Sequence, residues 1–449
     1  MTSAVRRHPR RHFIFTSTAA ASGLMLTWNS SHAASADKSK PRTTSPNEKL
    51  NIAAIGAGGQ AATDIAGVAT ENLIALCDID ETRLRERGKQ FPKARLFRDY
   101  RKMLEEVKEI DAVTVSTPDH HHAPASLLAM KLGKHVYCQK PLAHSIHEAR
   151  LMREMARARN VITQMGNQGH SYDSTRRVVE IVQSGALGEI REVHVWTDRA
   201  GSFWPQGMDR PKETPPVPEH IDWELWLGPA PQRPYHPAYL HFKWRGWWDF
   251  GTGAIGDMAC HNTDAAFWAL KLEAPASVEA ESSGVHAESP PVWSIIRYQF
   301  PARGELPPVL LTWYDGGKLP KPDLAPGVKL AKNGTLMIGS QGSLAFRDWN
   351  PDNFVLLPES KFAGFKGPEV TLPRAPKGAY QEWITACKGG PMCLSNFDYS
   401  GPLTEAMLLG NVALRAGKKI EWDTKRLKAK GCPEADYFIR RDYRKGWMA

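Results

Sequence analysis

The sequence predicts an α/β protein. Its first half should form a doubly wound parallel sheet, and its second half an α/β domain with a large, mostly antiparallel open sheet. From residue 51 to residue 165, short apolar runs alternate with amphipathic segments, which is typical of repeated strand–helix units. From about residue 292 onward, the apolar runs are separated by short glycine-containing turns instead. We therefore predict a first domain over residues 49–169 and a second over 170–449.

The first strand ends in a glycine turn that suits a dinucleotide. The apolar run Ile52–Ile55 is followed by Gly56, Ala57, Gly58, Gly59, Gln60 and Ala61. Glycine lets the backbone turn sharply and approach a pyrophosphate, and the following helix presents free N–H groups. Asp78 follows the second apolar run, where a carboxylate can accept hydrogen bonds from the adenosine ribose. The alternative is a turn that binds nothing, with Asp78 as a helix cap. The common register of strand, glycines, helix and acid favours the nucleotide site.

The rest of the first domain continues the alternation. We expect strands over Leu73–Leu76, Arg95–Phe97, Ala112–Ser116, His135–Cys138 and Val161–Met165, and helices over Glu81–Phe91, Tyr100–Val107, Pro124–Leu132 and Ser145–Ala158. Ligands of such a sheet bind beyond the carboxyl ends of its strands. The polar residues expected there, and predicted to line the cofactor site, are Thr117, Pro118, His120, His122, Gln139, Lys140, Asn167 and Gln168.

The histidine run at residues 120–122 and Lys140 each allow more than one interpretation. Residues His120–His122 could suggest a metal site, but three consecutive side chains in regular structure cannot all face one ion. We therefore predict no metal there; one or two of these histidines cap the next helix or line the cofactor cleft. Lys140 stands at a strand end before a proline. It can donate a hydrogen bond to a substrate oxygen or lower a neighbour's pKa. The alternative is an exposed loop lysine.

The second domain is predicted from mixed patterns. We expect helices over Ser174–Gln183 and Thr404–Ala416, strands over Ile190–Trp196, Val292–Phe300, Pro308–Trp313, Thr335–Ile338 and Ser343–Phe346, and a long ordered loop over residues 202–239. A helix is also expected from about Ala254. It would place Asp257 and His261, four residues apart, on one face. The carboxylate could then orient the imidazole and hold its protonated form, so that His261 serves as general acid and base.

Aromatic residues precede this pair. Trp244, Trp247 and Trp248 stand beside polar residues and suit the apolar face of a sugar ring, and with Arg245 they complete the predicted substrate site. The alternatives are that the tryptophans belong to the core and that Asp257 caps the helix. A metal site built from Asp257, His261 and Asp264 is also conceivable, but nothing in the sequence shows that these side chains converge.

The N-terminus has the pattern of an export signal. Arg10 and Arg11 precede an apolar stretch that ends near a small-residue cleavage site, so residues 1–36 are predicted to be a twin-arginine signal and residues 37–48 a linker. That stretch is too short and too rich in Ser and Thr for a stable membrane span. Export implies a periplasmic protein with no free nicotinamide pool, and hence a tightly bound cofactor.

Charge and cysteine usage exclude some classes. The net charge of +10 is partly local to the two ends of the chain, and no nucleic-acid-binding signature accompanies it. The six cysteines show no zinc spacing. We expect Cys77, Cys138 and Cys260 to be buried free thiols, whereas Cys387 and Cys393 are close enough in sequence to pair.

These motifs together resemble the Gfo/Idh/MocA oxidoreductases over nearly all of the mature chain. The resemblance rests on GAGGQA with Asp78, on residues 117–122, on residues 139–143 and on the Asp257–His261 pair. It implies a Rossmann domain followed by an open-sheet domain, a homodimer or homotetramer, and Lys140, Asp257 and His261 as the catalytic trio. Family members usually carry Glu at the position of Gln139.

The resemblance also implies an activity. It points to NAD(P)-dependent hydride transfer at a hydroxyl or carbonyl of a sugar or glycoside. Asp78 favours NAD over NADP, because its charge opposes a 2′-phosphate, although some exported relatives hold NADP. Two alternatives stay open: glycoside cleavage by a hydrolase or lyase through transient oxidation by bound NAD, and a non-catalytic sugar- or nucleotide-binding protein. Lys140 argues against the first, because NAD-dependent glycosidases usually lack it.

Overall fold

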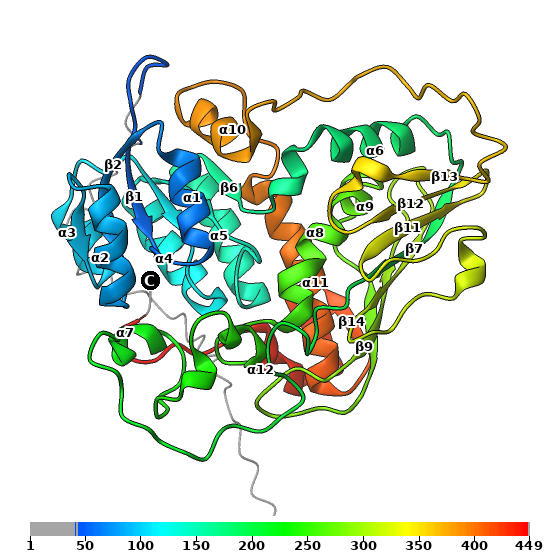
Figure 1. Cartoon of the computed structure of the whole chain (residues 1–449). Helices are drawn as coiled ribbons and strands as arrows, with labels where there is room; N and C mark the ends of the chain where they lie inside the picture. Colours follow the sequence, from blue (N-terminus) through cyan, green and yellow to red (C-terminus); the bar gives the residue numbers. More distant parts are fainter. Residues whose placement is uncertain (1–40, 42–43, 448–449) are drawn as a thin grey trace, which may run out of the picture. The chain divides into compact units, whose positions relative to one another are not determined.

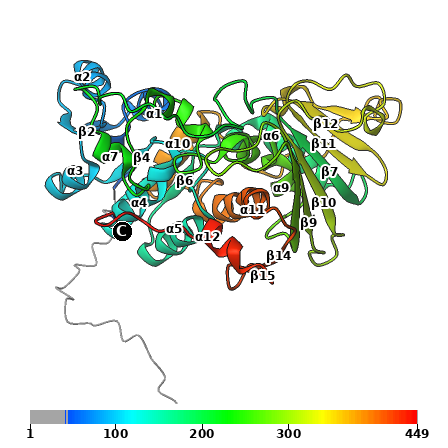
Figure 2. The ribbon, with the colours of Figure 1, turned by 90° about the horizontal axis from the view of Figure 1, so that it is seen from below.

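The structure is a computed structural model that describes residue 41 and residues 44–447. The predicted export signal and half of the predicted linker lie outside the described residues. The described part belongs to one compact unit and contains two sheets, shown in Figures 1 and 2. No helix in that part is long and apolar enough to span a membrane.

The first sheet confirms the doubly wound parallel prediction. All of its neighbouring strands pair in parallel, in the order β3 (Arg95–Phe97), β2 (Asn72–Cys77), β1 (Asn51–Ile55), β4 (Ala112–Val115), β5 (His135–Cys138) and β6 (Thr163–Met165). Its helices are α1 (Gln60–Val68), α2 (Glu81–Gln90), α3 (Tyr100–Glu106), α4 (Asp119–Lys131) and α5 (Ile146–Arg159). This order places the carboxyl end of β1 beside those of β2 and β4, where such folds bind ligands.

Helix α4 begins at Asp119, before the predicted start at Pro124. The sequence prediction treated Pro124 as the first helical residue, where proline is common. Proline is tolerated further inside because only one hydrogen bond is lost there. The missing N–H of Pro124 leaves the carbonyl of His120, four residues earlier, without its helical donor.

The second sheet has nine strands and is mostly antiparallel, as predicted. Only β7 and β10 pair in parallel. In pairing order the strands are β13 (Val355–Leu357), β12 (Ser343–Arg347), β11 (Gly334–Gly339), β7 (Ile190–Trp196), β10 (Val309–Tyr314), β9 (Ser294–Phe300), β8 (Ser277–Ser282), β14 (Ile420–Asp423) and β15 (Lys428–Lys430). Figures 1 and 2 show α6 (Asp173–Gln183), α9 (Asp264–Ala269) and α11 (Phe397–Ala416) on the side of this sheet that faces the first one.

Shorter helices complete the second half. They are α7 (Trp223–Leu227), a π-helical turn over Ile255–Ala259, α8 (Cys260–Asn262), α10 (Gly378–Cys387) and α12 (Asp436–Ile439). The sequence prediction missed α10. It lies against α1 of the first sheet, and its Trp383 and Ile384 are buried with Leu50 and Ile65 in one apolar cluster.

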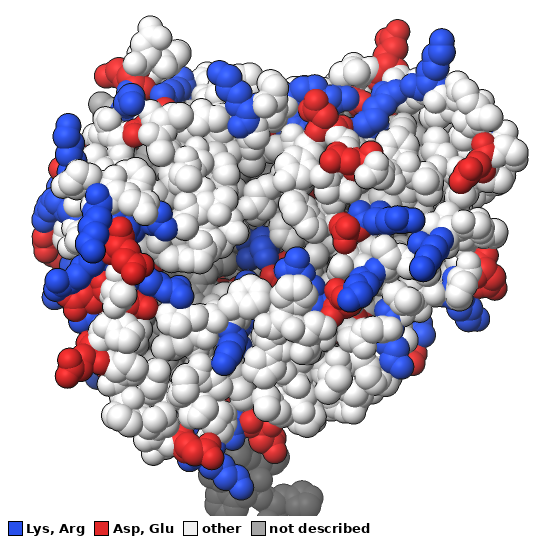
Figure 3. Space-filling view, viewed as in Figure 1, with Lys and Arg blue, Asp and Glu red and all other residues white. Residues whose placement is uncertain are grey.

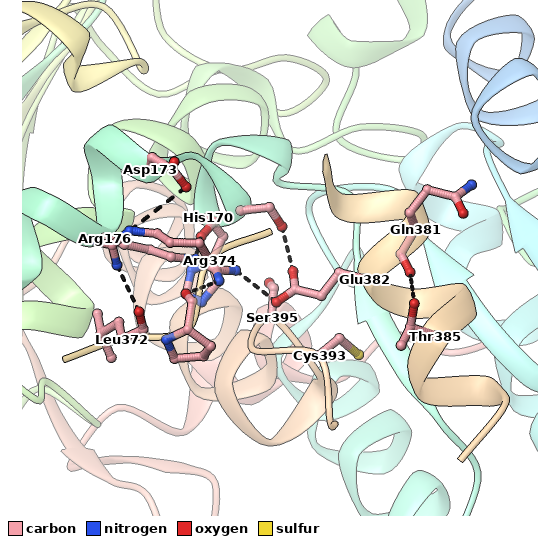
Figure 4. A network of polar contacts seen from close by, with 12 residues as sticks. His170, Asp173, Arg176, Leu372, Arg374, Gln381, Glu382, Thr385, Cys393 and Ser395 are labelled. Carbon is pink, nitrogen blue, oxygen red and sulfur yellow. Dashed lines mark hydrogen bonds and ion pairs between the residues drawn. The ribbon is translucent and has the colours of Figure 1, made fainter. Parts of the chain in front are cut away.

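Ion pairs fix the segment that carries α10. Glu382 binds the buried Arg176 of α6 at 2.7 Å, and both residues are labelled in Figure 4. Arg374 binds Glu180 of the same helix at 2.8 Å. The chain therefore returns from the second sheet to cover the first one. Residues well beyond 169 thus contribute to the core beside the first sheet. The domain boundary at residue 169 stays a prediction.

Candidate active site

One cavity of about 440 Å³ lies at the carboxyl ends of the parallel strands. The residues directly after five of the strands line it: Gly56, Asp78, Arg98, Ser116 and Gln139. Its opposite wall comes from the second half of the chain, including Arg199, Trp226, Phe242, Trp244 and Asp257. In the space-filling view, Lys or Arg atoms lie at the bottom of a hollow near the middle of the face (Figure 3). This is the place where a doubly wound sheet binds its ligand.

The glycine turn at the end of β1 requires its glycines. Gly56 has φ +103°, and a Cβ there would lie 2.6 Å from the carbonyl oxygen of Ser116. A Cβ on Gly58 would lie 2.5 Å from Cδ of Arg83. No side chain caps α1, and Gly58, Gly59 and Gln60 line the cavity, while Ala61 is buried beneath them. The N–H groups of Ala61 and Ala62 donate to the carbonyls of Gly58 and Gly59, so a phosphate would approach the glycine backbone at the start of the helix, and the residues present fit a dinucleotide.

Asp78 supports this turn. Its carboxylate accepts hydrogen bonds from the backbone N–H groups of Ala57 at 2.8 Å and Asp80 at 3.0 Å. Burial raises the pKa of Asp78, and these two hydrogen bonds oppose that rise. The carboxylate oxygens have further lone pairs on the cavity side, which a ribose hydroxyl can use.

Lys140 and Asp257 form a buried ion pair at the other end of the cavity. Lys140 Nζ lies 2.7 Å from Asp257 Oδ1, and Arg245 Nε and Arg199 follow at 3.2 Å and 3.5 Å from the same carboxylate. Burial lowers the pKa of Lys140, and the charge of Asp257 partly offsets that effect. Although burial opposes it, the charges of Lys140 and Arg245 hold the pKa of Asp257 well below its usual range. Asp257 therefore stays ionised, and its negative charge favours the protonated form of Lys140.

His261 has a different environment from the one expected. Residues 255–259 form a π-helical turn, so Asp257 and His261 are not stacked as in a regular α-helix. Among the described residues, no hydrogen bond joins them, and Nδ1 of His261 is buried without a partner. Burial, then the charge of Lys140, lowers the pKa of His261 to about 3. The imidazole is therefore neutral at pH 7 and able to accept a proton. The expectation that Asp257 orients His261 is wrong.

Gln139 is explained by a residue that the sequence analysis missed. Its Nε2 donates to both carboxylate oxygens of Asp64 on α1, at 2.9 Å and 3.0 Å. Ser116 and Tyr380 also donate to Asp64, at 2.5 Å and 2.7 Å. Burial raises the pKa of Asp64, and these hydrogen bonds oppose that rise. The carboxylate at this contact between residue 139 and α1 thus comes from Asp64. A Glu at position 139 would place a second buried carboxylate beside it.

The histidine run needs a correction. His121 lines the cavity, whereas His120 and His122 do not. His120 is fully buried and binds the carbonyls of Phe250 and Trp226, and His122 binds those of Pro141 and Thr117. Asn167 and Gln168 also lie outside the cavity lining, while Thr117 and Pro118 belong to it. The pattern could not reveal this, because the orientation of each side chain depends on where α4 begins.

The three predicted tryptophans fall into two groups, one at the cavity and one in the core. Trp244 and Arg245 line the cavity, but Trp247 and Trp248 do not. Trp247 is 0 % exposed and donates to the carbonyl of Ala238, and Trp248 donates to that of His286. These two are core residues, which was the alternative considered above.

The described residues offer neither a metal site nor a disulfide bridge. Within residues 44–447, no group of three or more His, Cys, Asp or Glu side chains could hold a metal ion. All six cysteines are buried and free, including Cys387 and Cys393. The proximity of those two in sequence therefore does not lead to a bridge.

The glycine turn and the buried lysine share one cavity, which defines the class of protein as a nucleotide-dependent oxidoreductase. The comparisons with known proteins agree. Residues 50–167 match the model of an oxidoreductase family with an NAD-binding Rossmann fold, and residues 173–306 match the C-terminal alpha/beta domain of the same family. The chain belongs to the Gfo/Idh/MocA family of oxidoreductases, and its first domain is that family's NAD-binding domain.

Individual relatives match over shorter stretches. D-glucoside 3-dehydrogenase of Escherichia coli is 33 % identical over 162 residues, which is 35 % of this chain and 44 % of that protein. Myo-inositol 2-dehydrogenase of Thermotoga maritima is 27 % identical over 117 residues, or 26 % and 35 % of the two chains. The aligned segments thus span less than half of these relatives.

Solved structures share the fold over a greater length. The WlbA dehydrogenase of Bordetella pertussis, in complex with NADH and UDP-GlcNAcA, gives a TM-score of 0.59 at 17 % identity, covering 84 % of this chain and 99 % of that one. Levoglucosan dehydrogenase in complex with NADH and L-sorbose gives 0.57 at 16 % identity, with 83 % and 99 % covered. At such identities the likeness is one of fold.

Proposed function

We propose that the protein is an NAD-dependent dehydrogenase that oxidises a hydroxyl group of a sugar or glycoside. The observation that carries this proposal is the Lys140–Asp257 pair, buried in the same cavity as the glycine turn. Relatives named as dehydrogenases of glucosides and inositol support a polyhydroxylated substrate. Trp244 in the cavity wall offers an aromatic face to a sugar ring.

Each of three residues has a separate role at the reacting hydroxyl group. Bound NAD supplies an acceptor for the hydride that leaves carbon. The family resemblance gives the hydroxyl proton to His261, whose imidazole is neutral because burial lowers its pKa. His261 itself stands outside the residues that line the cavity. The ammonium group of Lys140 donates a hydrogen bond to the same oxygen as it becomes a carbonyl oxygen. Asp257 keeps Lys140 charged and fixes its position.

A matched set of variants tests these roles. Lys140→Met and His261→Asn are each expected to lower kcat by at least about 100-fold, within the range for general acid–base groups. Lys321→Met, at an exposed position on the second domain, serves as the control. NADH formation is followed with glucosides, inositols and anhydrosugars. Wild-type turnover in both site variants would refute the assignment. Release of free sugar from a glycoside without net NADH would instead indicate cleavage through transient oxidation.

The proposal includes a preference for NAD and tight retention of it. Asp78 supports the preference, because a 2′-phosphate would meet its carboxylate. The test is mass analysis of the nucleotide released when the purified protein is denatured. NAD in near-stoichiometric amount is expected. A protein that carries no nucleotide, and takes up neither NAD nor NADP on incubation, would contradict the proposal.

Export and assembly are further parts of the proposal. Arg10 and Arg11, with the apolar stretch after them, support export through the twin-arginine route to the periplasm. The family resemblance supports a homodimer or homotetramer. Cell fractionation of the wild type and of a variant with both arginines replaced by lysine tests the route, and equal periplasmic amounts of both would argue against it. Light scattering tests the assembly, and a monomeric mass would refute it.

A further inference from the structure

The C-terminal tail, defined here as residues 440–447, returns to the first sheet after α12. Figures 1 and 2 show its end beside α4 and α7, far along the molecule from the second sheet that precedes it. The tail ends the described part of the chain, yet its last residue is buried: Trp447 is 8 % exposed. The proposed function does not account for this return.

The tail is first fixed at the α4 carbonyl that Pro124 leaves without a helical donor. Arg441 donates a hydrogen bond to the carbonyl of His120 at 3.0 Å. That carbonyl is available because Pro124 cannot supply the helical N–H. Arg441 also pairs with Glu148 of α5 at 3.1 Å, and Tyr443 donates to the same carboxylate at 2.6 Å. The tail is therefore fixed to two helices of the first sheet.

The second anchor joins the tail to the loop that covers the cavity. Arg444 donates to the carbonyls of Gly228 at 3.0 Å and Glu224 at 2.8 Å, and its backbone N–H donates to Pro229 at 3.1 Å. This loop begins at a β-bridge between Asp80 and Ile221 and contributes Leu225, Trp226 and Phe242 to the cavity wall. The tail is thus bonded to this loop at residues 224–229, near the start of the loop.

The tail ends inside the cavity wall. The Trp447 ring lies under the guanidinium of Arg101 at 4.0 Å, and its centroid is 5.5 Å from that of His121. It lines the cavity with Asp99, Tyr100 and His121. These residues follow β3 and β4, on the side of the cavity that also holds Asp78. Asp78 marks the adenosine ribose, so Trp447 lies at the adenosine end.

We propose that the C-terminal tail is part of the cofactor site. Trp447 forms a wall for the adenosine moiety. Arg444 fastens the tail to the covering loop and Arg441 fastens it to α4 and α5, so that the cofactor leaves only when the tail detaches. The inference rests on the proposed function in that it takes the ligand to be a nicotinamide dinucleotide. It adds a residue set, at the far end of the chain, that retains this ligand.

The test measures nucleotide binding, without turnover. Wild type, Trp447→Ala, Trp447→Phe and Tyr437→Ala are each saturated with NAD, and the nucleotide remaining after timed dialysis is quantified. Tyr437, on α12 and 63 % exposed, is the matched aromatic control. Trp447→Ala is expected to lose NAD about 10-fold faster, as for the loss of one aromatic contact with a base. Trp447→Phe should fall between, and Tyr437→Ala should match the wild type.

The binding of a second ligand, ADP-ribose, shows which part of the cofactor Trp447 contacts. ADP-ribose lacks the nicotinamide, so Trp447→Ala should weaken its binding by the same factor as that of NAD. Equal retention by Trp447→Ala and wild type would overturn the proposal, as would a variant that weakens NAD but leaves ADP-ribose unchanged. A wild type that binds NAD without turnover would refute the dehydrogenase proposal alone, and one that binds neither nucleotide would overturn both.

Discussion

Replacing Asp257 by Asn would remove the negative charge that contacts Lys140, Arg245 and Arg199. The carboxylate is 1 % exposed and lies 2.7 Å from Lys140, 3.2 Å from Arg245 and 3.5 Å from Arg199. A hydrogen bond between charged groups contributes about 1.5–3 kcal/mol. The pKa of Lys140, already lowered by burial, should therefore fall further in this variant, because the opposing charge of Asp257 is lost.

The same change should destabilise the protein in a pH-dependent way. Removing one partner of a buried ion pair costs about 3–5 kcal/mol of unfolding free energy. The folded-state pKa of Asp257 lies below its unfolded value, so its stabilising effect is fully present above about pH 4 and is lost as the pH falls through the folded pKa. The deficit of Asp257→Asn should thus be constant from pH 8 to pH 5 and shrink below pH 4.

Two measurements check this. The pH dependence of amine acylation at Lys140, read by peptide mass spectrometry, gives its midpoint, and urea unfolding gives the stability. Asp398→Asn is the matched control, because Asp398 pairs with Arg157 on the surface and should change stability by less than about 1 kcal/mol. A Lys140 midpoint that stays or rises in Asp257→Asn, or a deficit no larger than that of the control, would refute the reasoning.

Three further predictions follow from the cavity and its surroundings. Gln139→Glu should lower the urea midpoint at pH 7 and recover it towards pH 5, because two adjacent carboxylates with Asp64 raise a folded-state pKa and make the folded state bind more protons; a deficit that is the same at both pH values would contradict this. Asp78→Ala should raise the dissociation constant of NAD about 10-fold or more by calorimetry and affect NADP less; equal effects on both would count against the ribose role. Trp247→Ala should lower the unfolding free energy by about 3–5 kcal/mol, as for a core residue; a normal urea midpoint with a raised KM would place Trp247 at the substrate after all.

Local sequence patterns predicted the elements well where the signal was itself local. The strand, glycine turn and helix of residues 51–68 follow from apolar residues beside glycines, and β5 ends at Cys138 as expected. Prolines shifted two helix starts: α4 begins before Pro124 and α11 before Pro402. A proline inside the second turn of a helix removes one hydrogen bond, and packing elsewhere can compensate for it.

Side-chain partners were less accessible to prediction. The spacing of Asp257 and His261 assumed a regular α-helix, and the π-helical turn at residues 255–259 removes that relation. Asp64 carried no recognisable signal, since an acid in the middle of an amphipathic helix usually faces solvent. Arg199 follows a strand end of the second sheet, and that position could have drawn attention to it.

The sequence by itself determined the fold class, the glycine turn with Asp78 after the next strand, and the position of Lys140 at a strand end, because these depend on residues near one another along the chain. Only the tertiary structure decided which group Asp257 serves, which histidine faces the cavity and which tryptophans are core. Lys140 and Asp257 are 117 positions apart, and Arg101 and Gly446 are 345 positions apart. Contacts over such separations depend on how whole elements pack, and no periodicity within either segment encodes them.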